Sequence, residues 1–256
     1  MLDLRAADDR ESIEAAARAA FDAPIARGQA RVRRFNGLPD EVFAPAEGSE
    51  SIYTNELVDL DLPLLTHPGE ERAVEGAAAE ALGNPLLLRH PLERGVRVIA
   101  AHCASLGDSP DLDQPEKSRP TRRNFDLFAR LMDTPRYEGL LVGEISAIAQ
   151  ANRGTLVGEL LLRRDWHHRL LNGSDYPLPG VMPLFSLNAL AAAGLLDAAH
   201  IPLLRELREC HPIWFDIALK SPLAKQGERF PARVFETRGF FARSPAGNTP
   251  PASDKA

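Results

Sequence analysis

The sequence predicts an α/β protein built around a parallel β-sheet, and two observations support this prediction. Four short apolar runs follow one another between residues 62 and 175, and the apolar side chains within each run are almost continuous, as in strands that are covered on both faces. Longer segments with helical periodicity separate the runs, and such alternation is typical of βα units. The runs are LPLLTH (62–67), VRVIAAH (96–102), GLLVGEIS (139–146) and RLLNGSD (169–175).

Amino-acid composition and charge indicate a soluble globular protein and argue against some classes of partner. The chain has 256 residues, 44% hydrophobic and 26% charged, which is ordinary for a soluble globular protein of one large or two small domains. Its 30 basic and 36 acidic side chains are interspersed and give a net charge of −6, so we expect no nucleic-acid partner. No apolar stretch approaches the roughly 20 residues that span a bilayer, and the acidic N-terminus does not resemble a secretory signal. Cys103 and Cys210 form no metal-type spacing, and a cytoplasmic location without membrane partners fits these features.

We divide the chain into three parts. Residues 1–55 carry weak signals, although the stretch from 9 to 26 can form a helix. Residues 56–242 contain the four runs and form the predicted α/β domain. Residues 243–256 are polar and rich in proline, and we expect a disordered tail.

Helices are predicted between the runs. EERAVEGAAAEAL (70–82) begins with acidic residues, which favour the positive end of the helix dipole. TRRNFDLFARLMD (121–133) places Phe125, Phe128 and either Leu131 or Met132 on one face, and TLVGELLLRRD (155–165) is also amphipathic. Three further segments predict a helical cap at the C-terminal end of the domain, and they are PLFSLNALAAAGLL, AAHIPLLRELREC and PIWFDIALK.

Polar residues stand where three of the four runs end. His67, His102 and Asp175 each close an apolar run, and the third run ends in GEIS, so Glu144 and Ser146 can lie beside them. In a barrel or an open parallel sheet these positions meet at the carboxyl edge of the strands, where ligands bind. Imidazole nitrogen and carboxylate oxygen suit zinc or another borderline divalent ion. The sequence therefore predicts one site that contains two histidines and one aspartate.

The stretches LPLLTHPGEE, GVRVIAAHCASLG, LLVGEISAIAQANR, RLLNGSDYPLPG and HPIWFDIALK resemble the later strands of metal-dependent hydrolases of the amidohydrolase superfamily. The most similar branch is that of aminocarboxymuconate-semialdehyde decarboxylase, and NGSDYP is the most specific part of the match. The resemblance implies a (β/α)8 TIM barrel of which this chain holds strands five to eight. It also implies a divalent metal cofactor, with zinc as the first choice.

The resemblance assigns a role to each of the three residues. His67 would be the strand-five metal ligand, and His102 would bind a second metal or orient the substrate. Asp175 would bind metal and take a proton from the attacking water. The implied reaction on a small organic substrate is hydrolysis of a C–N or C–O bond, or non-oxidative decarboxylation, with Asp175 as the base and His102 polarising the scissile carbonyl or carboxylate.

Two features depart from the family pattern. The sequence contains no His-x-His pair, which supplies two metal ligands from the first strand in that family. About 55 residues before the match are also too few for four βα units of roughly 30 residues each. The alternative is therefore a truncated or inactive remnant that serves as a binding or partner-subunit protein. A homo-oligomer could cover the open edge of a half barrel.

Other segments have less specific interpretations. Residues 107–121 form a long polar connection that follows His102, and they can be either a substrate loop or a disordered segment. His167 and His168 are adjacent, so their side chains point apart and do not chelate one ion readily. The chain contains no GxSxG elbow, no phosphate-binding GxxxxGK[ST] loop and no GxGxxG, which excludes those catalytic templates.

Overall fold

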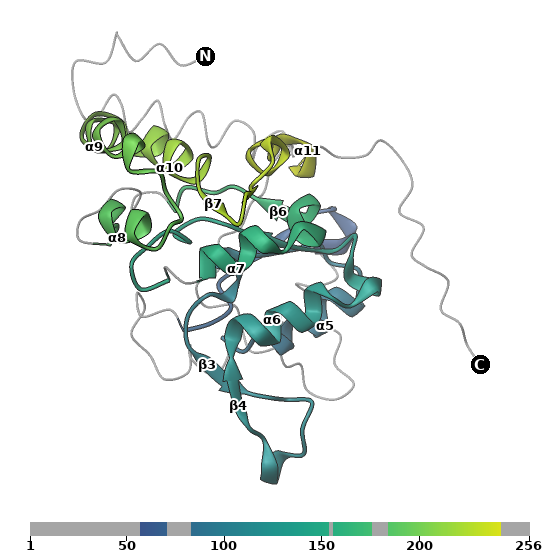
Figure 1. Ribbon diagram of the computed structural model, residues 1–256. Coiled ribbons are helices and arrows are strands. Elements are labelled where there is room, and N and C mark those ends of the chain that lie inside the picture. Colours follow the sequence, from purple (N-terminus) through teal and green to yellow (C-terminus); the bar gives the residue numbers. More distant parts are fainter. Residues whose placement is uncertain (1–56, 71–82, 154–155, 176–183, 242–256) are drawn as a thin grey trace, which may run out of the picture. The chain divides into compact units, whose positions relative to one another are not determined.

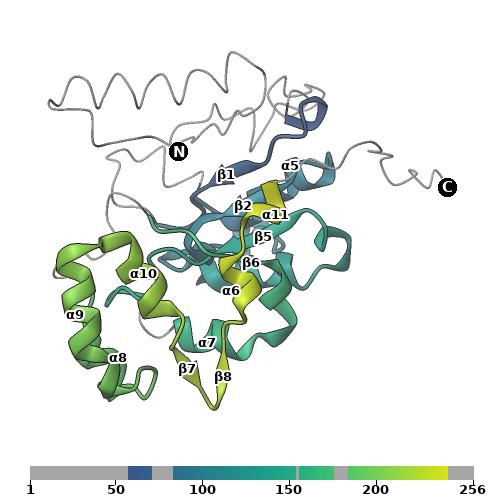
Figure 2. The ribbon, with the colours of Figure 1, turned by 90° about the horizontal axis from the view of Figure 1, so that it is seen from above.

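A four-stranded parallel β-sheet organises the domain in a computed structural model that describes residues 57–70, 83–153, 156–175 and 184–241. The strands lie side by side in the order in which they occur in the chain (Figure 2). They are β1 (Leu64–Thr66), β2 (Val98–Ala100), β5 (Leu141–Glu144) and β6 (Leu170–Leu171). Each strand lies within one of the four apolar runs, so the predicted α/β class with a parallel sheet is confirmed.

The register aligns the carboxyl ends of the strands. Val98 of β2 pairs with Leu64 of β1 on one side and with Leu141 of β5 on the other, and Gly143 of β5 pairs with Leu170 of β6. Every residue of β2 and β5 is buried, which explains why their sequences are apolar without alternation. The polar residues that follow the strands therefore emerge along one edge of the sheet.

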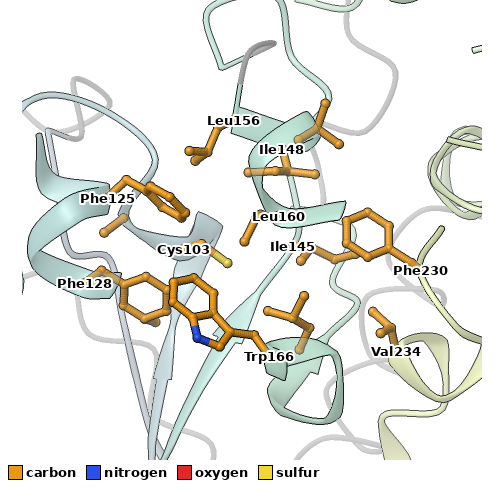
Figure 3. Packing of buried hydrophobic residues seen from close by; sticks show 14 of the residues in the cluster. Cys103, Phe125, Phe128, Ile145, Ile148, Leu156, Leu160, Trp166, Phe230 and Val234 are labelled. Carbon is orange, nitrogen blue, oxygen red and sulfur yellow. The ribbon is translucent and has the colours of Figure 1, made fainter. Parts of the chain in front are cut away.

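Helix α6 (Asn124–Met132) covers part of the core as its sequence predicts. Phe125, Phe128, Leu131 and Met132 are all buried. The two phenylalanine rings meet Trp166 edge-on, with ring centroids 5.9 and 6.0 Å apart (Figure 3). The helix begins at Asn124 and not at residue 121, because residues 121–123 pair as a strand.

The remaining helices follow the predicted segments. Helix α7 (Leu156–Leu162) leads to β6, and α8 (Leu187–Ala192), α9 (Ile201–Cys210) and α10 (Pro212–Lys220) confirm the three C-terminal helical segments (Figure 2). Helices α5 (Arg89–Glu93) and α11 (Arg238–Phe241) are short. The described ranges also contain seven 3-10 helices, which are η2 (Pro85–Leu88), η3 (Ala101–Ala104), η4 (Glu116–Ser118), η5 (Pro135–Tyr137), η6 (Arg164–Arg169), η7 (Ala198–His200) and η8 (Ala232–Phe235).

The polar connection 107–121 is folded. It contains strand β3 (Asp108–Pro110), which pairs antiparallel with β4 (Thr121–Arg123) (Figure 1). Arg130 of α6 donates hydrogen bonds of 2.8 and 2.9 Å to the Asp111 carboxylate, and Arg89 forms an ion pair with Asp113. These contacts correct the expectation of a disordered segment. None of the residues in this connection lines the cavity described below, so the expectation of a substrate loop is not supported either.

Two small features complete the described part of the chain. Strands β7 (Ala224–Lys225) and β8 (Glu228–Arg229) form a short antiparallel hairpin. Across the described ranges, no helix combines the length and apolar character that a membrane crossing requires. The predictions for residues 1–55, for the helix at 71–82 and for the tail at 243–256 lie outside the described residues.

Candidate functional site

A cavity of about 310 Å³ lies at the carboxyl ends of the sheet strands. His67 follows β1, His102 follows β2, Glu144 and Ser146 stand at the end of β5, and Asp175 follows β6, and all five residues line the cavity. The structure thus brings together the three residues that the sequence predicts for one site, together with the two from GEIS. Apolar side chains form much of the remaining wall, and they include Leu65, Ile99, Leu171 and Phe241.

The backbone turn after β2 coincides with η3, is not helical at His102 and Cys103, and presents His102 to the cavity. His102, Cys103 and Ala104 have φ angles of 54°, 51° and 51°, in the left-handed region that residues with a Cβ adopt rarely. Asp175, which follows β6, also has a positive φ of 54°. Left-handed conformations of such residues cost of order 1 kcal/mol each and gather at functional sites. Two of the three residues that the sequence pattern selects, His102 and Asp175, thus have this conformation. It also occurs elsewhere among the described residues, at Asp61, Ala147 and Gln226.

Hydrogen bonds fix the orientation and the tautomer of His102. Its Nδ1 lies 3.0 Å from the carbonyl oxygen of Ser146 and 2.8 Å from the Oγ of the same residue. Because a carbonyl oxygen only accepts hydrogen bonds, Nδ1 carries the proton and donates it. In the neutral ring, Nε2 then presents a lone pair, and it lies 3.9 Å from Oδ1 of Asp175.

Burial keeps the His102 imidazole neutral near pH 7. The side chain is almost fully enclosed, and burial lowers its pKa to about 4, helped by the positive charge of Arg153 and by His67. Asp175 and the backbone carbonyl of Ser146 oppose this shift. A neutral imidazole with its lone pair directed toward the cavity can bind a metal ion or accept a proton.

Glu144 ties β5 to the turn after β2. Its carboxylate accepts hydrogen bonds from the backbone N–H and the hydroxyl of Ser146, both at 2.6 Å, and from the backbone N–H of His102 at 3.3 Å. These contacts leave little room at Gly173, where a Cβ atom would overlap Oε1 of Glu144. The glycine in the NGSD turn is therefore required by this close approach.

The donor groups fit a metal ion in chemistry and in the spacing of one pair. A tetrahedral ion with bonds of about 2.1 Å holds two ligand atoms about 3.4 Å apart. The 3.9 Å between Nε2 of His102 and Oδ1 of Asp175 exceeds this only slightly. The His67 ring lies nearby, with its centroid 5.1 Å from that of His102. Within the described ranges, no group of three His, Cys, Asp or Glu residues is already arranged to hold an ion.

Neither His167 nor His168 lines the cavity. The His167 ring is buried, with Nε2 3.3 Å from the carbonyl oxygen of Leu160, whereas His168 is exposed and lies 3.1 Å from the Glu138 carboxylate. The two side chains thus face different surroundings.

Sequence reasoning missed two groups at the site. Thr237 and Phe241, near the end of the described chain, line the cavity. Lys220 and Asp216 of α10 form a buried ion pair, and Lys220 donates a hydrogen bond to the carbonyl oxygen of Gly173 in the NGSD turn. The signal for this pair was present, because the two ionic residues stand four apart in the otherwise apolar segment PIWFDIALK. An i,i+4 spacing puts them on one face of the helix.

Comparisons of the chain with family models, with curated proteins and with solved structures found no match.

Proposed function

We propose that this protein is a metal-dependent hydrolase-like enzyme that acts on a small organic molecule. The reaction is hydrolysis of a C–N or C–O bond or non-oxidative decarboxylation, and zinc is the first metal to test. One observation carries the proposal: a neutral His102 donates Nδ1–H to a backbone carbonyl and presents Nε2 to a cavity carboxylate. Metal-binding histidines commonly have this arrangement of the second ring nitrogen.

Each residue of the site would have its own chemical role. A bound divalent metal would lower the pKa of a coordinated water toward neutrality. Asp175 would accept the proton that this water releases, since its carboxylate lines the cavity beside His102. His102 and His67 would contribute imidazole nitrogens to the metal, and Asp175 would contribute a carboxylate oxygen. The hydrogen bonding of His102 favours this ligand role over the polarisation of a substrate bond, because neutral His102 has no proton on Nε2 to donate.

The sheet topology supports a relation to a (β/α)8 barrel. Four parallel strands in sequential order, with polar residues at one edge, match what strands five to eight of such a barrel present. We propose this half-barrel architecture on that basis. A second copy of the chain would then cover the open strand edges.

The apolar wall of the cavity favours a second candidate function. Leu65, Ile99, Leu171 and Phe241 would hold a small apolar molecule without any reaction, as in a binding or partner-subunit protein derived from an enzyme. This candidate keeps the cavity but does not require the metal.

Zinc binding separates the two candidates. The purified protein should contain or take up one zinc ion per chain, as measured by elemental analysis and isothermal titration calorimetry. His67→Ala should weaken binding at least tenfold, because a ligand is lost. His168→Ala is the matched control, since His168 is exposed and outside the cavity, and it should bind zinc like the native chain. A native chain that folds but binds no zinc would favour the second candidate.

A further inference from the structure

Helix α10 contains a buried ion pair between Lys220 and Asp216. The Lys220 side chain has 0% of its surface exposed and that of Asp216 has 2%, and Nζ lies 2.8 Å from the carboxylate. Taking two charges out of water costs several kcal/mol for each ion, so buried pairs are often no more stable than well-packed apolar replacements. Helix stability alone is therefore a weak explanation for the pair.

The ammonium group of Lys220 connects α10 to the turn that carries Asp175. Besides Asp216, Nζ donates hydrogen bonds to Oδ1 of Asn172 at 3.1 Å and to the carbonyl oxygen of Gly173 at 2.7 Å. An ammonium group has three protons, so these three acceptors use all of them. Burial raises the pKa of Asp216, and Lys220 together with a hydrogen bond from the Asn172 side chain opposes that rise.

The turn that Lys220 contacts also borders the cavity. Asn172 and Gly173 line the cavity, and Asp175 lies two residues further along the chain. The backbone N–H of Asn172 also donates to the carbonyl oxygen of Val234 at 2.7 Å, which holds the start of the turn. Lys220 itself does not line the cavity, and its hydrogen bonds connect it to the site through this turn.

We propose that Lys220 and Asp216 are a positioning pair, which holds the Asn172–Asp175 turn so that the Asp175 carboxylate stays beside Nε2 of His102. The pair supplies directional hydrogen bonds to a backbone carbonyl and a side-chain amide, which apolar residues of the same size do not supply. The consequence for metal affinity rests on the proposed function, whereas the consequence for the turn does not.

The test uses the double variant Asp216→Leu/Lys220→Met, which removes both charges together and leaves no buried charge unpaired. We expect zinc affinity to fall roughly 10- to 100-fold, as for other residues that orient metal ligands. Lys225→Met is the matched control, because Lys225 lies in the β7–β8 hairpin and not at the cavity, and its zinc affinity should stay within about twofold of the native value.

A double-mutant cycle with Asp175→Asn separates positioning from a general structural effect. If the pair acts through Asp175, the double variant should lose little further zinc affinity once Asp175 is replaced. An equal loss with and without Asp175 would overturn the proposal.

Amide hydrogen exchange of residues 173–175 gives a readout that needs no metal. Exchange in the metal-free double variant should be at least tenfold faster than in the native chain, with α6 unchanged. Unchanged exchange in the turn would overturn the positioning role. If the native chain binds no zinc, the proposed function fails, and the exchange measurement still decides whether the pair holds the turn.

Discussion

Replacing Gly173 with alanine tests how tightly the site is packed. The added Cβ would overlap Oε1 of Glu144 and lie 2.7 Å from its Cδ, whereas Cβ contacts under 3.0 Å are essentially never observed. Glycine is not needed here for a left-handed backbone, because Gly173 is not among the glycines with positive φ. The effect of the substitution therefore comes from the contact with the carboxylate.

The contacts of Glu144 determine how much stability the Gly173→Ala substitution should cost. Either Glu144 gives up hydrogen bonds to Ser146 and His102, or the turn moves away from β5. A lost hydrogen bond to a charged group costs about 1.5–3 kcal/mol, and overpacking costs about 1–3 kcal/mol. We expect the free energy of unfolding to fall by about 2–4 kcal/mol, which corresponds to a decrease in Tm of roughly 5–15 °C for a chain of this size.

Urea denaturation followed by circular dichroism measures this loss. Gly139→Ala is the control, because a Cβ there meets nothing within 4 Å, and it should change stability by less than about 0.5 kcal/mol. In a Glu144→Ala background the cost of Gly173→Ala should fall by about 2 kcal/mol, because the clashing carboxylate is gone. Additive effects of the two substitutions, or a Gly173→Ala variant as stable as the control, would refute the reasoning.

Three further predictions concern other residues of the domain. Asp175→Asn should abolish any metal-dependent turnover while leaving the free energy of unfolding within about 0.5 kcal/mol of the native value, and an unchanged rate would remove Asp175 from the mechanism. The pKa of His102 is lowered in the fold to about 4 from a usual value near 6.5, so the unfolded chain takes up the proton first as pH falls. Between pH 7 and pH 5, protonation of His102 in the unfolded chain should lower the free energy of unfolding of the metal-free protein by about 2 kcal/mol. The His102→Gln variant, denatured at both pH values, should not show this part of the decrease. Arg169→Met should destabilise the fold by roughly 3 kcal/mol or more, because the buried guanidinium donates to the carbonyl oxygens of Leu141, Met132 and Tyr137, and a loss below 1 kcal/mol would show that water replaces it.

The sheet and the cavity residues were predictable because both follow from short-range patterns. Continuous apolar runs identify strands that are buried on both faces, and a parallel arrangement brings the residues after each run to one edge. His67, His102 and Asp175 could therefore be assigned to one place without knowledge of any contact. Their roles as ligands and base stay predictions, since neither the geometry nor the comparisons test them.

The rest of the site depends on contacts between residues that are distant in the sequence. Lys220 meets Asn172 and Gly173 across 48 and 47 positions, and no local pattern specifies such a meeting. The β3–β4 pairing was missed for a similar reason, because its strands are short and polar and ion pairs with Arg89 and Arg130 hold the connection in place. The left-handed turn after β2 has no glycine or asparagine to signal it, as residues 101–104 read AHCA.

That turn has a consequence for attempts to engineer a more robust protein. Ala104 has a φ of 51°, so glycine at this position would relieve backbone strain that the native residue tolerates. The same freedom would loosen the segment that orients His102, two residues earlier. Selection for thermal stability alone would then favour substitutions that leave the orientation of His102 in the cavity less well defined. The turn after β2 is a point at which stability and activity would be optimised by different residues.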